Sequence, residues 1–212
     1  MRISELSRRS GVPVATIKYY LREELLPKGE ATSATQAVYS DAHLRRLRLI
    51  RALVEGAEAP LAKIRTILEA IDDTGIDLHR LLGTVQYALT PDTPHNDGPE
   101  WREAERSTDE LLARLGWRVS PLSPARHQLT RTIVTLARVG YQVDPQTLDL
   151  YAEAVHTAAE HDVGRVDPAA PREQVVEYVA AMTALMDQAL VSLHRLAQED
   201  VSARRLRGGA DC

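Results

Sequence analysis

The chain contains no phenylalanine in 212 residues, and aromatic residues make up only 4% of it. A hydrophobic core must therefore be built mainly from Leu, Val, Ile and Ala, which dominate the 44% of residues that are hydrophobic. This mixture favours helices packed on helices over a sheet, in which aromatic and β-branched residues are enriched. Composition and length together predict a mainly all-α protein with one large domain or two small ones.

Composition also excludes several classes of protein. The single cysteine, Cys212, is the last residue of the chain, so neither an intrachain disulfide nor a zinc site with several cysteines can form. The N-terminus lacks the apolar stretch of a signal peptide, and no apolar run approaches the roughly 20 residues that span a bilayer. We therefore expect a cytoplasmic protein with no membrane partner.

Charge is distributed unevenly along the chain. Residues 1–51 contain 10 basic and 5 acidic residues, a net charge of +5, whereas the remaining residues have a net charge of −9. A basic segment joined to an acidic body is typical of a nucleic-acid-binding domain attached to a domain with another task. Chance clustering of basic residues would give the same distribution of charge. Sequence motifs are therefore needed to distinguish a nucleic-acid-binding segment from chance.

The basic segment has the pattern of a helix-turn-helix. Gly11 ends a short first helix, and the following proline is suited to the first turn of a second helix at about 13–24. In this second helix Ile17, Tyr20 and Leu21 fall on one face, so we expect them to be buried against the third helix, near residues 44–47. The polar and basic side chains then lie on the opposite face, as in a DNA-reading helix.

The residues after this helix pair predict a small hairpin. Residues 28–39 are rich in turn and β-capable residues and indicate a wing, although a flexible loop would fit the same composition. Ser40 and Asp41 can cap a third helix, and a proline at position 60 opens a fourth. Four arginines lie between the apolar positions of the third helix, where they can contact phosphates or only solvate the helix: Arg45, Arg46, Arg48 and Arg51.

Five segments follow one another in a characteristic order and spacing: GVPVATIKYY at 11–20, LLP at 25–27, VYSD at 38–41, RLRLI at 46–50 and PLAKIRTIL at 60–68. In these segments the chain resembles MerR-type transcriptional regulators over about residues 1–70. Two positions depart from the family pattern. Lys18 stands where the family usually has arginine, and Gln36-Ala37 stands where the wing usually has a Tyr-Arg pair.

The resemblance implies a winged-helix domain that binds double-stranded promoter DNA as a dimer, with the second helix in the major groove and the wing along the backbone. It also implies RNA polymerase as a partner, since activators of this type bend and untwist promoters for the polymerase. We expect contacts with DNA from polar, basic and aromatic residues of the second helix, the wing and the third helix: Thr16, Lys18, Tyr19, Arg22, Lys28, Gln36, Tyr39 and Arg46.

The acidic body begins with a break in the helical pattern. A short helix is predicted at about 77–88, and residues 91–99 then contain three prolines and a glycine, which cannot continue it. MerR-type proteins usually dimerise through one long helix at this point. Because about a dozen residues are too few for that helix, we expect the dimer contacts to involve residues 100–207 instead.

The predicted domains are therefore a winged-helix DNA-binding domain at 1–75, a short helix and proline-rich linker at 76–99, and a helical effector or dimerisation domain at 100–212. Four helices are predicted in the last region, at about 100–115, 123–139, 144–161 and 171–207. The final helix contains an unbroken heptad repeat: Val175, Val179, Met182, Met186, Ala189, Leu193 and Leu196. Packing within the chain and pairing with a partner helix both explain this repeat. Packing within the chain is slightly favoured, because the other three helices of this region need a helix to pack against.

The body contains no convincing set of catalytic residues. Glu153 and His156 have the Glu-x-x-His spacing of di-metal sites, but no second such pair exists, so we expect no metal, no cofactor and no enzymatic activity. Trp117 and Tyr151 are the candidates for an effector pocket, because such side chains can place a polar group in an apolar wall. The sequence pattern would be the same if Trp117 and Tyr151 were residues of the hydrophobic core.

The function predicted from the sequence is that of a sequence-specific, DNA-binding transcriptional regulator controlled by an effector through its C-terminal helices. Two alternatives stay open. The chain could be a helical interaction module whose basic segment does not bind specific DNA. It could also be a small-molecule-binding protein or a metal-dependent enzyme whose site lies in the acidic body.

Overall fold

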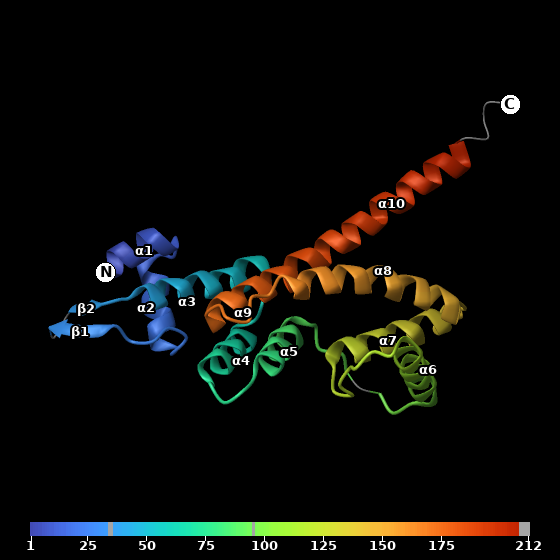
Figure 1. Cartoon of the computed structure of the whole chain (residues 1–212), viewed down its shortest axis with the longest axis horizontal. Coiled ribbons are helices and arrows are strands. Elements are labelled where there is room, and N and C mark those ends of the chain that lie inside the picture. Colours follow the sequence, from blue (N-terminus) through green and yellow to red (C-terminus); the bar gives the residue numbers. More distant parts are fainter. Residues whose placement is uncertain (34–35, 95, 208–212) are drawn as a thin grey trace. The chain divides into compact units, whose positions relative to one another are not determined.

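The computed structural model describes residues 1–33, 36–94 and 96–207, and this part of the chain is predominantly helical (Figure 1). Its elements are α1 (Ile3–Ser10), α2 (Val14–Arg22), β1 (Glu30–Ser33), β2 (Gln36–Val38), α3 (Asp41–Arg51), the π-helical turn η1 (Ala52–Gly56), α4 (Leu61–Asp72), α5 (Leu78–Leu89), α6 (Pro99–Leu115), α7 (Pro124–Arg138), α8 (Pro145–Gly164), α9 (Arg172–Ala181), the π-helical turn η2 (Met182–Met186) and α10 (Asp187–Arg207). The predicted fold class is confirmed, including the small β wing.

The chain forms two compact units. The first consists of residues 1–89 together with residues 168–212, and the second of residues 90–167. The sequence predicts a different grouping, in which residues 100–212 form one domain. The difference arises because α9, which follows the second unit in the chain, packs against α3, α4, α5 and η1 of the first.

The core of the first unit is built from leucine and isoleucine, as the absence of phenylalanine requires. Its fully buried side chains come from the helices and the turn after α2: Leu6, Ile17, Leu25, Leu26, Leu47, Leu49, Ile50, Leu53, Ile64, Ile67, Leu68 and Leu81. Between α2 and α3 the two strands pair antiparallel, with Glu30 opposite Val38 and Ala31 opposite Ala37. A wing is therefore present where the sequence allowed either a wing or a loop.

Arg172 connects α9 to the end of α4 and the start of α5. Its guanidinium donates hydrogen bonds to three backbone carbonyls, those of Ile76 (3.0 Å), Ala70 (3.1 Å) and Asp73 (3.0 Å). Carbonyl groups at the end of a helix have no partner within that helix. Arg172 thus supplies donors to the α4–α5 connection and orients α9 on it.

The heptad repeat of the last helix divides into two parts. Helices α9 and α10 continue one another through η2 (Figure 1). Val175 and Val179 are buried, whereas Leu193 and Leu196 are each 61% exposed. Packing within the chain, which the sequence slightly favoured, therefore accounts for the first part of the repeat alone. By length and composition alone, the helix at 172–206 could also cross a membrane, since an 18-residue window within it has a mean hydropathy of 1.2.

The second unit contains α6, α7 and α8. Trp101 and Ala104 of α6 pack against Val134 of α7 in a small buried cluster. Beside this cluster the hydroxyl groups of Thr108 and Thr130 lie 3.1 Å apart, so the two helices also share a buried hydrogen bond. The helices predicted at 100–115, 123–139 and 144–161 correspond to α6, α7 and α8.

Candidate nucleic-acid interface

The turn between α1 and α2 is held by backbone and side-chain hydrogen bonds. Gly11 ends α1 with a φ of +72°, a conformation that glycine adopts without strain, and its N–H donates to the Ser7 carbonyl. The Ser7 hydroxyl donates to the Val12 carbonyl at 2.7 Å. A Cβ at Gly11 would lie 2.6 Å from Arg51 Nη1, so glycine also leaves space for that guanidinium.

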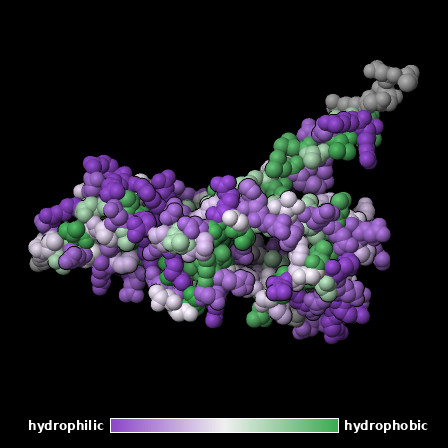
Figure 2. Space-filling model, viewed as in Figure 1, coloured by the Kyte–Doolittle hydropathy of each residue, from purple (hydrophilic) through white to green (hydrophobic). Residues whose placement is uncertain are grey.

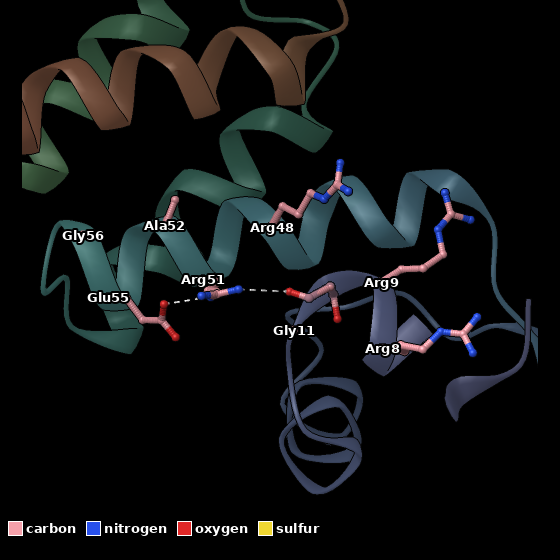
Figure 3. Close-up of a pocket in the computed structure, with 9 residues that line it drawn as sticks. Arg8, Arg9, Gly11, Arg48, Arg51, Ala52, Glu55 and Gly56 are labelled. Atoms are coloured by element: carbon pink, nitrogen blue, oxygen red, sulfur yellow. Dashed lines mark hydrogen bonds and ion pairs between the residues drawn. The ribbon is translucent and has the colours of Figure 1, made fainter. Parts of the chain in front are cut away.

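Arg51 connects this turn to α3. Its Nη1 donates to the Ser10 carbonyl at 3.4 Å, while its Nε donates to Glu55 at 2.7 Å (Figure 3). Because the turn determines the angle between α1 and α2, this contact helps to fix the direction in which α2 points. The helix-turn-helix geometry thus depends on α3 as well as on the two helices themselves.

Helix α2 presents different faces to the core and to solvent. Ile17 and Tyr20 are buried, and burial raises the pKa of the Tyr20 phenol. Lys18 and Arg22 are exposed on the other side, while Thr16 and Tyr19 are half-buried. The Arg22 guanidinium lies 5.2 Å from the centre of the Tyr19 ring, a cation–π distance. Four of the predicted DNA-contacting residues therefore lie on α2 outside its buried face.

The prediction that Leu21 is buried beside Ile17 is wrong. Leu21 is half-buried and lines a groove between α2 and the wing. In a helix, Ile17 and Tyr20 define the centre of the inward face, and a residue one position after Tyr20 is rotated about 100° toward its edge. Leu21 thus lies at the edge of the inward face, where it is half-buried and contributes an apolar side chain to the groove.

The groove between α2 and the wing has a volume of about 550 Å³. Lys18 of α2, Gln36 of β2 and Tyr39 all line it, so the structure brings three of the predicted residues together. Tyr39 itself is only 7% exposed, and its ring packs edge-on against His43. Lys28 is exposed at the start of the wing but does not line this groove.

Arg2 belongs to the same groove and was missed by the sequence analysis. Its guanidinium donates a hydrogen bond to the Gln36 side chain. The terminal amino group of Met1 donates to the Tyr39 carbonyl at 2.7 Å, and the Tyr39 N–H donates to the Met1 carbonyl at 2.8 Å. These bonds pair the N-terminus with the end of the wing, and a pairing between residues so far apart in the chain leaves no local sequence signal.

Arg46 does not belong to this surface, contrary to the prediction that it contacts DNA. The side chain is buried, with Nε donating to the Leu25 carbonyl at 2.7 Å. Its two terminal nitrogens donate to the Asp72 carboxylate at 2.7 and 2.8 Å. A phosphate could reach this guanidinium only if these bonds broke, so Arg46 connects α3 to α4 and to the turn after α2.

A second basic hollow, of about 650 Å³, is lined by Arg8, Arg9, Arg48 and Arg51 (Figure 3). Most of its charge is compensated. Arg8 pairs with Glu5, Arg9 lies 3.2 Å from Asp41, and Arg51 pairs with Glu55. Arg48 forms no ion pair with any residue in the described part of the chain. The hollow is therefore less positive than its four arginines suggest.

A cavity of about 460 Å³ lies within the second unit. Its lining includes Trp101, Arg131, Val134, Thr135 and Arg138. Trp101 and Val134 belong to the buried cluster of this unit, and Arg138 is bonded to Glu100 at 2.7 Å. The cavity thus combines an apolar floor with guanidinium groups at its edge.

Trp117 and Tyr151, the predicted effector residues, do not line this cavity. The Trp117 ring stacks on His156, with the ring centres 5.3 Å apart, and Tyr151 is 48% exposed. His156 also lies 3.4 Å from Glu160, one turn further along α8. Among the described residues, no group of three or more His, Cys, Asp or Glu side chains could hold a metal ion.

Comparisons with known proteins agree with the geometry of the first unit. Residues 1–71 match a family model described as MerR HTH family regulatory protein. The crystal structure of the putative transcriptional regulator SCO5550 from Streptomyces coelicolor A3(2) is similar over 97% of both chains, with 38% sequence identity and a TM-score of 0.75. A comparison with curated protein sequences found no match. The chain belongs to the MerR family of helix-turn-helix regulatory proteins.

Proposed function

We propose that the chain is a transcriptional regulator that binds double-stranded promoter DNA as a homodimer, with α2 in the major groove and the wing along the backbone. The observation that carries this proposal is the two-faced character of α2. Ile17 and Tyr20 hold one face in the core, so Lys18 and Arg22 are presented to solvent. A helix-turn-helix reads DNA with the outward face of its second helix.

The proposed contacts divide by chemistry. Lys18 and Arg22 suit phosphates, because both are cationic and exposed. Thr16, Tyr19 and Gln36 offer hydrogen-bonding groups that can also reach base edges. Arg2 and Lys28 extend the basic surface along the wing groove and the start of the wing. DNA binding is in this proposal a property of residues 1–75.

The proposed cellular location, the cytoplasm, and the proposed partner, RNA polymerase, are those expected for a member of this family. A regulator of promoters acts in the cytoplasm, where promoter DNA and RNA polymerase meet. The similarity to a transcriptional regulator along 97% of both chains supports a shared role. No catalytic step is proposed for the chain.

The proposal is tested by measuring binding to an operator recovered by genomic footprinting, at a series of salt concentrations. Phosphate contacts release counterions, so affinity should fall steeply as salt rises. The Lys18→Ala variant should bind more weakly and have a salt slope lower by about one unit. Arg102→Ala, which removes an exposed arginine in the second unit, is the control and should behave as the parent. An unchanged slope and affinity for Lys18→Ala would contradict the proposal.

We further propose that the cavity of the second unit binds an effector with an aromatic or aliphatic body and a carboxylate. Its volume falls within the range of small-molecule sites. Trp101 and Val134 supply the apolar wall, and Arg131 supplies a guanidinium that forms no ion pair in the described part of the chain. Trp117 and Tyr151 have no role in this site.

Benzoate is a minimal probe for this cavity. With Trp117 replaced by phenylalanine, Trp101 is the single tryptophan, so its emission reports binding directly. Titration with benzoate should change that emission in a saturable way, and Arg131→Ala should weaken the effect. Emission that does not respond to benzoate, or responds equally in Arg131→Ala, would argue against a carboxylate site.

A further inference from the structure

One stripe of α7 forms a side of the cavity in the second unit. Its members follow one another at spacings of three and four residues, which places them on one face of the helix: Arg131, Val134, Thr135 and Arg138. Val134 is buried beside Trp101, whereas both arginines are exposed. Figure 2 shows a visible surface that is largely hydrophilic, so the apolar wall of this cavity differs from most of that surface.

The two guanidinium groups of this stripe differ in their partners. Arg138 Nε donates to the Glu100 carboxylate at 2.7 Å, so its charge is paired. Arg131 forms no ion pair in the described part of the chain. Two guanidinium groups and one carboxylate therefore line the cavity, and together they leave one positive charge. That charge belongs to Arg131.

The other polar side chains of the lining are engaged within the chain. The Thr135 hydroxyl donates to the Arg131 carbonyl at 2.8 Å. The Asn96 side-chain oxygen accepts a hydrogen bond from the Gly98 N–H, also at 2.8 Å. Among the described residues of this lining, the group best suited to an anion is thus the Arg131 guanidinium.

Glu100 has two reasons to stay beside Arg138. The first is the ion pair itself, although both side chains are 60% exposed and such pairs contribute little to stability. The second is its place in the first turn of α6, where the helix dipole favours an acidic side chain. A ligand carboxylate that approaches Arg138 therefore meets the negative charge of Glu100.

We infer that Glu100 is a specificity-determining residue of this cavity, which selects ligands with one carboxylate over ligands with two. The inference rests on the proposed effector site. The first carboxylate of a ligand pairs with Arg131, and a second one has to compete with Glu100 for Arg138. Repulsion between like charges near a protein surface corresponds to roughly a threefold to tenfold change in Kd. A binding site gains selectivity by placing such a charge against the wrong ligand.

The test compares two ligands of similar size in the Trp117→Phe protein, with Trp101 emission as the readout. Terephthalate carries a second carboxylate where para-methylbenzoate carries a methyl group. Terephthalate should bind roughly threefold to tenfold more weakly than para-methylbenzoate. Glu100→Gln removes the negative charge and frees Arg138, so this preference should shrink by about the same factor. Because terephthalate binding is expected to improve, misfolding cannot produce this result.

Two further variants show whether the effect comes from the pair of Glu100 and Arg138. Glu103→Gln is the matched control, since Glu103 is exposed on α6 and does not line the cavity, so the parental preference should remain. Adding Arg138→Ala to Glu100→Gln should remove the improvement in terephthalate binding.

The outcomes separate this inference from the proposed effector site. Equal affinity of the parent for both ligands, or an unchanged preference in Glu100→Gln, would overturn the inference and leave a carboxylate site standing. An equal loss of preference in Glu103→Gln would also overturn it. A parent whose emission responds neither to benzoate nor to para-methylbenzoate would refute the effector site itself, and the inference with it.

Discussion

Basic side chains in the first unit serve two purposes, and the surroundings of each cationic group decide which. Lys18 and Arg22 are exposed on α2 and can meet a phosphate. Arg46 is buried and donates three hydrogen bonds, to one backbone carbonyl and one carboxylate. The planar guanidinium suits such a site, because its donors point in fixed directions that match a carboxylate. Arg51 combines contacts with α1 and with its own helix.

Arg46→Ala is expected to destabilise the protein by about 2–3 kcal/mol, since it leaves a buried carbonyl without its partner and removes a bidentate charged pair. The partial exposure of Asp72 keeps the loss below that of a fully buried ion pair. Urea unfolding of the purified variant measures the change. Arg48→Ala, at an exposed position on the same helix, should lie within about 0.5 kcal/mol of the parent.

The opposite result for Arg46 is equally informative. If Arg46→Ala unfolds at the same urea concentration as the parent but loses affinity for the operator, its guanidinium contacts DNA. That outcome would restore the role expected from the sequence and contradict the role assigned from the contacts.

At the scale of the element, α2 is held by one narrow face. Ile17 is fully buried and Tyr20 nearly so, and Leu21 lies at the boundary beside Lys18. The wing meets the other side of this boundary through Ala31, Gln36 and Ala37. The groove thus has an apolar floor and polar edges, which suits contact with a sugar-phosphate backbone.

Substitution of two residues of α2 should separate folding from binding. Ile17→Ala is expected to cost about 2–5 kcal/mol, as for other large side chains removed from a core. Leu21→Ala should cost roughly 1 kcal/mol, because a half-buried side chain loses less contact. Its affinity for the operator should nevertheless fall, since the groove changes shape. Thermal melting and operator binding are measured together, and equal destabilisation by both variants would place Leu21 in the core.

On the scale of the whole molecule, the chain returns to its N-terminal unit after passing through a second unit. Helix α9 buries Val175, Val176 and Val179 against α3, α5 and η1. Arg172 adds hydrogen bonds to the connection between α4 and α5. Residues that follow the second unit in the chain therefore complete the packing of the first unit.

A chain truncated after residue 89 should be much less stable than the first unit in the full protein. Loss of the three buried valines alone lowers the free energy of unfolding by roughly 5 kcal/mol or more, since burying each side chain contributes ~1.5–3 kcal/mol. We expect thermal unfolding of the truncated chain, monitored by circular dichroism, to be broad and to occur at a lower temperature than in the full protein. A truncated chain that melts cooperatively at the parental temperature would show that α9 contributes little to the stability of this unit.

The sequence by itself determined the elements of the first unit and its family. The signals there are local: a glycine that ends α1, apolar residues at helical spacing in α3 and α4, and turn residues in the wing. Such signals depend on the conformational preferences of neighbouring residues, so a short segment of the sequence is enough to contain each of them. The same holds for the heptad repeat that runs from α9 into α10.

Only the tertiary structure decided which of these residues are buried and against what. Arg46 and Asp72 are 26 residues apart, and Arg172 reaches a carbonyl 96 residues before it. Periodicity shows that a helix has an apolar face but not what covers it, which is why Val175 is buried while Leu193, in the same repeat, is exposed. Burial is a property of contacts between distant segments, and these exist once the chain has folded.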